Sequence, residues 1–567
     1  MSDVTRPLTV AEAAAVLTSP GARYELEDVV VDGRSLRRYK NAPRHMRDIF
    51  VATGVYADRD AIVYQDERLT YGQLYVCVGE LAWAMRERFG ISRGDRVALL
   101  MRNLPEYIVA FWAAQVLGAI AVPLNAWWSE SELRTGLDNA EPQLLIVDGE
   151  RFERLGEALE DLGVPQVIVT RHEGELPAGV LDWEQALAAG AGYDGLPPAP
   201  ELSSDDPATI IYTSGTTGHP KGAVATSRNH LALIMTAGYQ SELAALTASR
   251  PPAARPTAQP TLLNTLPMFH IGGISSLYCS AAGGVKQVLM YKWDSEDALR
   301  LFADEEVTNI SAVPTVLRRL LEAAAASGQR LETLSGAGVG GGPGAGELAD
   351  ALAAAIGPDS LINHGYGLTE TTSSVTQHIG SSYFARPASA GPAVPGAEVR
   401  IVNENREAGL GEPGEIWVRG PQVISEYWRN PEATAESMVH GWFRTGDVGA
   451  LDADHYLTIL DREKDVVIRG GENVYSVEVE TVIASHPDVA DVAVVGLPDP
   501  DLGEIVAAVV VPRDGLTLNE AELRAKVASS VATFKVPTVW WIRPEPLPRN
   551  ATAKVLKHEL RRTFPRV

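Results

Sequence analysis

The feature that most limits the possible folds and functions of this chain is a loop rich in glycine and hydroxyl residues, which directly follows an apolar strand. The β-branched run Thr209–Ile211 predicts a buried strand, and residues 212–222, YTSGTTGHPKG, come next. Glycine allows a backbone N–H to approach a phosphate closely, hydroxyls donate to phosphate oxygens, and lysine adds a positive charge. The candidate phosphate ligands are Thr213, Ser214, Gly215, Thr216, Thr217 and Lys221. The loop therefore predicts a nucleoside-triphosphate site.

The loop is not a P-loop of the Walker A type. That motif needs a lysine followed by Ser or Thr at the start of a helix. Here Pro220 precedes the lysine and Gly222 follows it, so no helix is expected to begin there. The alternative interpretation is a Ser/Gly-rich surface loop without a ligand.

Composition narrows the class of protein. The chain has 567 residues, 45% of them apolar, and a net charge of −24. This apolar fraction is typical of a soluble globular protein, and the acidic balance argues against a nucleic-acid partner. The two cysteines, Cys77 and Cys279, exclude a disulfide framework and a multi-cysteine metal site. We expect a cytoplasmic protein in which both cysteines act as small apolar residues.

One segment has nearly the length and apolarity of a membrane span. Residues 107–128 are largely apolar, but Gln115, Gly118 and Pro123 interrupt them. We predict a buried helix over residues 105–117 and a buried strand over 119–123, and no transmembrane segment. The first 20 residues carry Asp3 and Glu12 and do not resemble a signal peptide.

Helical and strand patterns alternate along the first part of the chain. A helical pattern covers residues 69–89, and short apolar strands are predicted at 96–100, 144–147 and 167–169. This alternation favours an α/β fold of parallel sheets covered by helices. Residues 241–260 are rich in Ala and Pro and predict a surface loop, with a lid over the site as the alternative. From residue 461 onward a compact series of strands and a helix predicts a small α+β domain.

Further blocks carry residue types suited to nucleotide chemistry. They are LPMFHIGG at 266–273, NHGYGLTET at 363–371, GWFRTGD at 441–447, DREKDVVIRGG at 461–471 and LPRNATAKVLK at 547–557. Glu370 offers the hard oxygen that Mg²⁺ prefers, and Asp447 follows a glycine, as a turn residue or a ribose ligand would. Each block alone also has a purely structural explanation.

Together, and in this order, the blocks resemble the adenylate-forming superfamily of acyl-CoA synthetases, nonribosomal adenylation domains and beetle luciferases. The resemblance covers most of the chain. It implies a large N-terminal domain of parallel sheets covered by helices plus a β-barrel-like subdomain, here residues 1–460. A small mobile α+β C-terminal lid domain, residues 461–567, would follow.

The resemblance also implies roles for single residues. Loop 213–221 would bind the ATP phosphates, and Thr216 would lie near Mg²⁺. Gly338 and Tyr366 would contact adenine, and Gly367 would belong to the same nucleotide site. Asp447 would bind the ribose, and Arg462 the ribose or phosphate. Thr369, Glu370 and Lys554 would be catalytic, with Glu370 also holding Mg²⁺. Lys464 would be the hinge, Gly470 and Gly471 would border the CoA arm, and His270 and Gly272 would contact the acyl group.

Two positions qualify this interpretation. Ala553 stands before the catalytic lysine where the family has glycine, which places the local geometry in question. Phe269-His270 lacks the aspartate with which amino-acid-activating relatives bind an ammonium group, which favours a simple carboxylic acid. A lone histidine there could equally be a core residue.

The predicted function is ATP- and Mg²⁺-dependent activation of a carboxylic acid through acyl-AMP to an acyl-CoA thioester. Medium- or long-chain fatty acids are the first expectation and aryl acids the second. The alternatives are transfer to a carrier-protein thiol and an inactive nucleotide-binding protein. ATP, CoA and the acid are the expected partners, and a homodimer is a further possibility.

Overall fold

The computed structural model describes most of the chain in two units. It describes residues 7–31, 33–156, 158–213, 220–248, 259–340, 348–357, 360–404, 406–549 and 554–565. The first unit comprises residues 1–340, 345–398 and 418–443, and the second comprises 341–344, 399–417 and 444–567. The predicted domain boundary after residue 460 remains a prediction.

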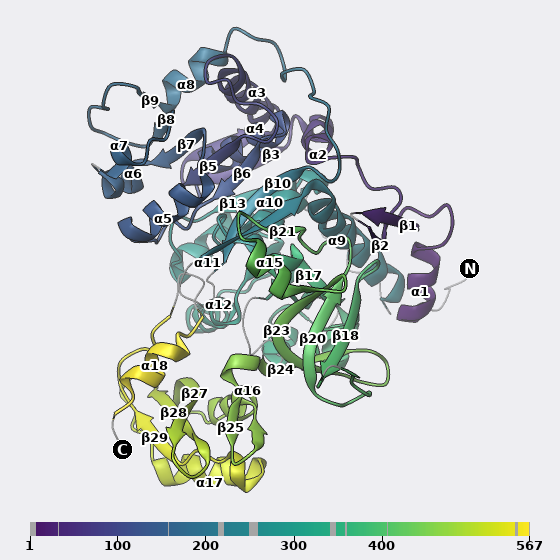
Figure 1. The fold of residues 1–567 in the computed structure, drawn as a ribbon, viewed down its shortest axis with the longest axis vertical. Helices are drawn as coiled ribbons and strands as arrows, with labels where there is room; N and C mark the ends of the chain where they lie inside the picture. The colour runs from purple at the N-terminus through teal and green to yellow at the C-terminus, as the bar shows by residue number, and fades with distance from the viewer. Residues whose placement is uncertain are drawn as a thin grey trace. The chain divides into compact units, whose positions relative to one another are not determined.

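Two eight-stranded sheets form the framework of the first unit (Figure 1). One sheet has the order β21-β11-β10-β6-β5-β7-β8-β9 and the other β17-β16-β15-β14-β12-β13-β3-β4. The inner strands pair in parallel, whereas β11, β17 and β4 pair antiparallel at or near the edges. The predicted α/β fold with parallel sheets is therefore confirmed.

The strands of the first sheet are β21 (Glu426–Tyr427), β11 (Lys221–Thr226), β10 (Pro207–Thr213), β6 (Ile120–Pro123), β5 (Arg96–Leu100), β7 (Leu144–Asp148), β8 (Val167–Thr170) and β9 (Val180–Asp182). Those of the second are β17 (Ser373–Ile379), β16 (Leu361–Leu368), β15 (Gly336–Val339), β14 (Asn309–Ala312), β12 (Thr261–Asn264), β13 (Lys286–Leu289), β3 (Asp60–Tyr64) and β4 (Glu67–Thr70).

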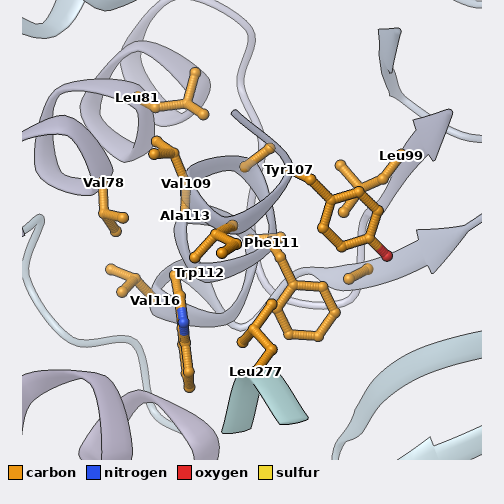
Figure 2. Packing of buried hydrophobic residues seen from close by; sticks show 14 of the residues in the cluster. Val78, Leu81, Leu99, Tyr107, Val109, Phe111, Trp112, Ala113, Val116 and Leu277 are labelled. Carbon is orange, nitrogen blue, oxygen red and sulfur yellow. The ribbon is translucent and has the colours of Figure 1, made fainter. Parts of the chain in front are cut away.

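Helix α4 (Pro105–Leu117) lies at the centre of the largest core cluster. Gly118 ends it in the left-handed conformation, and β6 follows as predicted. Figure 2 shows Phe111 and Trp112 of this helix among side chains of α3 (Tyr71–Glu87), β5 and α10 (Ile271–Gly283). The apolar run that resembled a membrane span is therefore a buried core helix, and no described helix is long and apolar enough to cross a membrane.

The other helices of the first unit are α1 (Val10–Leu17), α2 (Met46–Ala52), α5 (Glu130–Ala140), α6 (Gly149–Leu155), α7 (Ala158–Asp161), α8 (Trp183–Gly190), α9 (Ser227–Thr247), α11 (Ser295–Asp304), α12 (Pro314–Ser327), α13 (Ala349–Ile356), α14 (Ser381–Ala385) and α15 (Pro431–Ser437). The prediction of a surface loop from residue 241 is wrong for residues 241–247. Helix α9 continues to Thr247, and Leu243 and Ala244 are buried. Residues 249–258, where a lid was the alternative, lie outside the described residues.

An antiparallel hairpin precedes the first large sheet. It pairs β1 (Leu26–Val31) with β2 (Arg34–Tyr39), and Tyr24 and Tyr39 pack with α1 and the buried side of α9. The Tyr39 hydroxyl lies 3.1 Å from Thr236 Oγ1 of α9, which fixes the hairpin to that helix.

Two smaller sheets involve the second unit. The first contains β19 (Arg406–Glu407), β18 (Glu398–Asn403), β20 (Gly414–Arg419), β23 (Trp442–Leu451), β22 (Met438–Val439) and β24 (Leu457–Arg462), and it forms the half-barrel part of the fold. The second contains β26 (Glu472–Val474), β25 (Val467–Arg469), β28 (Gly503–Pro512), β27 (Val489–Asp499) and β29 (Val539–Ile542). Helices α16 (Ser476–Ala484), α17 (Glu520–Ser530) and α18 (Lys557–Thr563) complete the predicted small α+β domain.

Candidate active site

The predicted phosphate loop connects two antiparallel strands. β10 ends at Thr213 and β11 begins at Lys221, and these two residues are direct partners across the pair. The Thr213 hydroxyl donates to the Lys221 carbonyl over 3.4 Å. The prediction that no helix begins at the lysine is confirmed. The candidates Ser214, Gly215, Thr216 and Thr217 lie outside the described residues.

Tyr427 links two of the candidate residues. The Lys221 ammonium lies 5.5 Å from the centre of the Tyr427 ring, and the Tyr427 hydroxyl donates to Glu370 Oε1 over 2.9 Å. Burial, with the Glu370 charge second, raises the pKa of Tyr427, so it remains a hydrogen-bond donor. The structure thus brings a lysine from the phosphate loop and the predicted Mg²⁺ ligand to one tyrosine.

Sequence reasoning missed Tyr427. It reaches this position because β21 pairs with β11, with Tyr427 opposite Ala223, and because the Trp428 N–H donates to the Gly222 carbonyl over 2.7 Å. A single tyrosine distant in sequence from the recognised blocks gives no spacing signal of its own.

Two glycines in the block at 363–371 allow strand β17 to pack closely against β16. A Cβ on Gly365 would lie 2.3 Å from the Thr376 carbonyl oxygen, and one on Gly367 would lie 1.7 Å from that of Ser373. Any larger residue would therefore separate β16 from β17. Tyr366 lies between them and is buried, and Gly338 of β15 is the parallel partner of Asn363. The predicted nucleotide-site residues Gly338, Tyr366 and Gly367 are thus on neighbouring strands.

A short turn presents Thr369 and Glu370 at the end of β16. The two residues begin a 3-10 turn, Thr369–Thr371, and Thr369 is buried. No α-helix begins at Thr369. Leu368 precedes the 3-10 turn, and its N–H donates to Thr371 Oγ1 over 2.7 Å.

The backbone behind this turn is strained. Thr372 and Ser373 have φ values of 47° and 83°, a region that residues other than glycine rarely adopt. Such outliers persist where the surroundings impose them, and they concentrate at functional sites. Thr371 supports this backbone, since its hydroxyl contacts the Ser373 carbonyl at 2.6 Å.

His270 caps helix α10. Its Nδ1 accepts a hydrogen bond from the Gly272 N–H at 3.3 Å, and a Cβ on Gly272 would lie 2.9 Å from Leu266 Cδ1. The apolar residues that follow, Ile274 and Leu277 among them, are fully buried in the main core cluster. Core packing therefore accounts for this apolar stretch, which gives no independent evidence for an apolar acyl pocket.

The second unit holds the other nucleotide candidates. Asp447 on β23 is buried and pairs directly with Arg462 on β24, with 3.4 Å between Arg462 Nε and Asp447 Oδ1. Lys464 follows in a 3-10 turn, Glu463–Asp465. Burial, with Arg462 second, lowers the pKa of Lys464, and Arg561 of α18 donates to the Lys464 carbonyl over 3.2 Å.

Gly470 and Gly471 form the two-residue turn between β25 and β26. Their φ values are +61° and +87°. A two-residue hairpin turn of type I′ requires positive φ at both positions, so the turn itself accounts for both glycines. Their contact with a CoA arm remains a prediction.

Lys554 belongs to the second unit, and residues 550–553 before it lie outside the described residues. The question about Ala553 is therefore not addressed by the structure. Lys557, from the same block, forms a largely buried ion pair in which both side chains are 14% exposed: its Nζ lies 2.7 Å from Glu480 Oε1 on α16. Burial, opposed by Lys557, raises the pKa of Glu480.

The residues fit a magnesium ion that is held mainly by substrate. Among the described residues, no group of three or more His, Cys, Asp or Glu side chains could enclose a metal. Mg²⁺ commonly takes one or two carboxylates together with substrate phosphates, and Glu370 supplies one such carboxylate, oriented by Tyr427. The second candidate, Thr216, is outside the described residues.

Comparisons with known proteins agree with this fold. The AMP-binding enzyme family matches residues 50–428, and the AMP-binding enzyme C-terminal domain matches residues 478–554. The 2-succinylbenzoate–CoA ligase of Bacillus licheniformis is 34% identical over 506 residues, 89% of this chain and 96% of the relative. The long-chain-fatty-acid–CoA ligase FadD13 of Mycobacterium tuberculosis is 33% identical over 513 residues, 88% of this chain and 94% of the relative.

Solved structures show the same architecture. The o-succinylbenzoate CoA synthetase MenE of Bacillus subtilis, in complex with the acyl-adenylate intermediate OSB-AMP, has a TM-score of 0.74 at 29% identity, covering 92% of this chain and 99% of that one. The same enzyme with ATP and a magnesium ion has a TM-score of 0.74 at 30% identity, covering 90% and 98%.

The fold and these matches define an adenylate-forming enzyme with a large parallel-sheet region, a half-barrel and a small C-terminal domain. The chain belongs to the AMP-binding enzyme family. Within that family it is an AMP-forming acid–CoA ligase, which works through an acyl-adenylate.

Proposed function

We propose that the chain activates a medium- or long-chain fatty acid with ATP and transfers the acyl group to CoA. The observation that carries the nucleotide half of this proposal is the cluster of Lys221, Tyr427 and Glu370, in which one tyrosine contacts both a cation and a carboxylate. FadD13, whose name specifies a long-chain fatty acid, supports the acyl half.

In the first half-reaction a carboxylate oxygen attacks the α-phosphorus of ATP and pyrophosphate leaves. Mg²⁺, when bound, neutralises phosphate charge, and Glu370 would hold it. Lys221 and the 213–217 hydroxyls would hold the phosphates, Thr369 the α-phosphate, and Lys554 the charge that develops at the reacting phosphate. In the second half-reaction the CoA thiol attacks the acyl carbon and AMP leaves. The residues act by positioning and by charge stabilisation, so no covalent enzyme intermediate is needed.

An aryl acid is the second candidate substrate. Succinylbenzoate–CoA ligases match this chain as well as the fatty-acid ligase does. The absence of an aspartate at Phe269-His270 suits either class, since neither substrate carries an ammonium group beside its carboxylate.

A panel of acids separates the two candidates. Pyrophosphate release is measured with fatty acids of increasing chain length, with benzoates and with succinylbenzoate, each with ATP and Mg²⁺. Highest kcat/KM for a fatty acid supports the proposal, and highest kcat/KM for an aryl acid replaces the substrate while leaving the reaction intact. Thioester formed with a carrier protein but not with free CoA would contradict the proposed acceptor.

A further inference from the structure

A strongly basic run stands out in this acidic chain. Residues 34–47, RSLRRYKNAPRHMR, contain six Arg or Lys residues and no Asp or Glu, in a chain with a net charge of −24. The run includes β2 of the N-terminal hairpin and ends before residue 50, where the family match begins. The basic run therefore lies outside the region that the family match covers.

The basic run forms one wall of a cavity in the first unit. The cavity has a volume of about 380 Å³, within the range of small-molecule sites. Its other walls are the segment before β10, the start of α9 and Pro421. Four cationic side chains line the cavity, namely Arg38, Lys40, Arg44 and Arg228. Tyr39 and Ser204 also line it.

Arg228 is the buried member of this group. Its side chain is only 7% exposed, its Nε lies 2.7 Å from Asp205 Oδ1, and its Nη1 donates to the Pro421 carbonyl over 2.9 Å. These bonds fix the guanidinium at the back of the cavity, so a ligand there would meet a charge that is already positioned.

Two of the other cations are paired with partly buried glutamates. Arg38 Nε lies 2.9 Å from Glu27 and Lys40 Nζ lies 2.8 Å from Glu25. Ion pairs whose cation remains open to solvent contribute modestly, so a ligand anion can compete with the two glutamates. The Arg44 side chain is exposed and forms no ion pair among the described residues. Four cations against three carboxylates leave the cavity positive.

We propose that this cavity binds a small phosphorylated molecule. A phosphate carries up to two negative charges and offers several acceptors, which suits guanidinium groups in particular. The volume limits the ligand to a small molecule, and the cavity wall contains residues of the hairpin that lie outside the family match. The described ends of the phosphate loop, Thr213 and Lys221, do not line this cavity, and the proposal does not depend on the proposed substrate.

Isothermal titration calorimetry with inorganic phosphate and with 3-phosphoglycerate tests this proposal. No nucleotide is present, because AMP carries a phosphate group and would compete for the same cavity. Arg38→Gln and Arg44→Gln remove donors from the cavity wall. Because hydrogen bonds to charged groups are strong, each substitution is expected to weaken binding roughly tenfold or more.

Arg37→Gln is the matched control. Arg37 is the neighbour of Arg38 on β2, its side chain is 60% exposed, and it does not line the cavity. The change in net charge is the same, so binding should stay at the wild-type value. Thermal unfolding of all three variants confirms that they fold.

Saturable binding that both cavity variants weaken and Arg37→Gln leaves unchanged supports the proposal. Equal weakening by Arg37→Gln would indicate only a general charge effect and overturn it. Absence of saturable binding to the wild-type chain, or binding that neither cavity variant alters, would overturn it as well.

Discussion

At the scale of single residues, the nucleotide site depends on contacts that join distant parts of the chain. Glu370 and Lys221 were predicted from their motifs, whereas Tyr427, which contacts both, became visible only through the β11–β21 pairing. Motifs identify residues that act within a few positions of one another. They do not identify a partner that sheet pairing brings in from elsewhere.

Glu370→Gln should raise the magnesium requirement of the first half-reaction. Glutamine keeps the size of the side chain and an oxygen that accepts from Tyr427, but it removes the anionic ligand. Pyrophosphate release measured against Mg²⁺ concentration should therefore need much more metal for half-maximal rate. Tyr427→Phe, which removes only the hydroxyl, should give a smaller shift. An unchanged magnesium dependence in Glu370→Gln would remove this residue from the metal site.

Lys554→Ala should separate the two half-reactions. The lysine is proposed to contact the charge that develops at the α-phosphate, so acyl-AMP formation should fall roughly a hundredfold or more. Thioester formation from supplied acyl-AMP should largely survive. The two rates are measured separately in single-turnover experiments. Equal losses in both would count against the role assigned to Lys554.

At the scale of elements, local patterns predicted segments whose sequence reflects their burial. Helix α4 and strand β5 have the predicted bounds, because each is apolar along nearly its whole length and ends at a turn signal. The end of α9 was predicted as a loop, since Ala- and Pro-rich sequence follows it, yet Leu243 and Ala244 are buried and extend the helix. Tertiary packing determines where α9 ends, and this end could not be predicted from local composition.

Helix α18 is joined to α16 by the Lys557–Glu480 ion pair, which makes the pair a test of the C-terminal domain's stability. Lys557→Met keeps the apolar stem and removes the charge, leaving Glu480 buried without its cation. Breaking a buried pair in this way costs about 3–5 kcal/mol. The melting temperature should fall, and Lys557→Met/Glu480→Gln should recover much of it.

The loss in Lys557→Met should also depend on pH. Burial raises the pKa of Glu480 in the folded state above its unfolded value, so the folded state binds this proton more tightly. The associated stability is present below the unfolded pKa and is lost as pH rises through the folded pKa. Melting temperatures of the variant should therefore fall further behind wild type as pH increases from acidic to neutral. A deficit that is the same at every pH would contradict this explanation.

At the scale of the whole molecule, the sequence predicted which kinds of sheet and domain the fold contains. The parallel-sheet region, the half-barrel and the small α+β domain follow from strand and helix patterns and from the family resemblance. By their contacts, residues 399–417 and 444–460, which contain much of the half-barrel, belong to the same unit as the C-terminal part of the chain. Such grouping depends on contacts between distant segments, which local pattern does not record.

Lys464→Pro tests whether the chain pivots at the predicted hinge. Proline fixes φ near −65° and removes a backbone donor, so a segment that must change conformation between half-reactions would be held in one state. Pyrophosphate release in a single turnover should persist, while thioester formation from synthetic acyl-AMP should fall steeply. Wild-type rates in both steps would place the hinge elsewhere.

The most direct test of the central claim follows an oxygen atom from the acid. The best acid from the panel is prepared with ¹⁸O in its carboxylate and converted with ATP, Mg²⁺ and CoA, and the products are analysed by mass spectrometry. If the carboxylate attacks the α-phosphorus and the thiol then displaces AMP, one labelled oxygen appears in AMP and the pyrophosphate is unlabelled. Formation of ADP and labelled inorganic phosphate would instead show activation at the γ-phosphate and contradict the acyl-adenylate route.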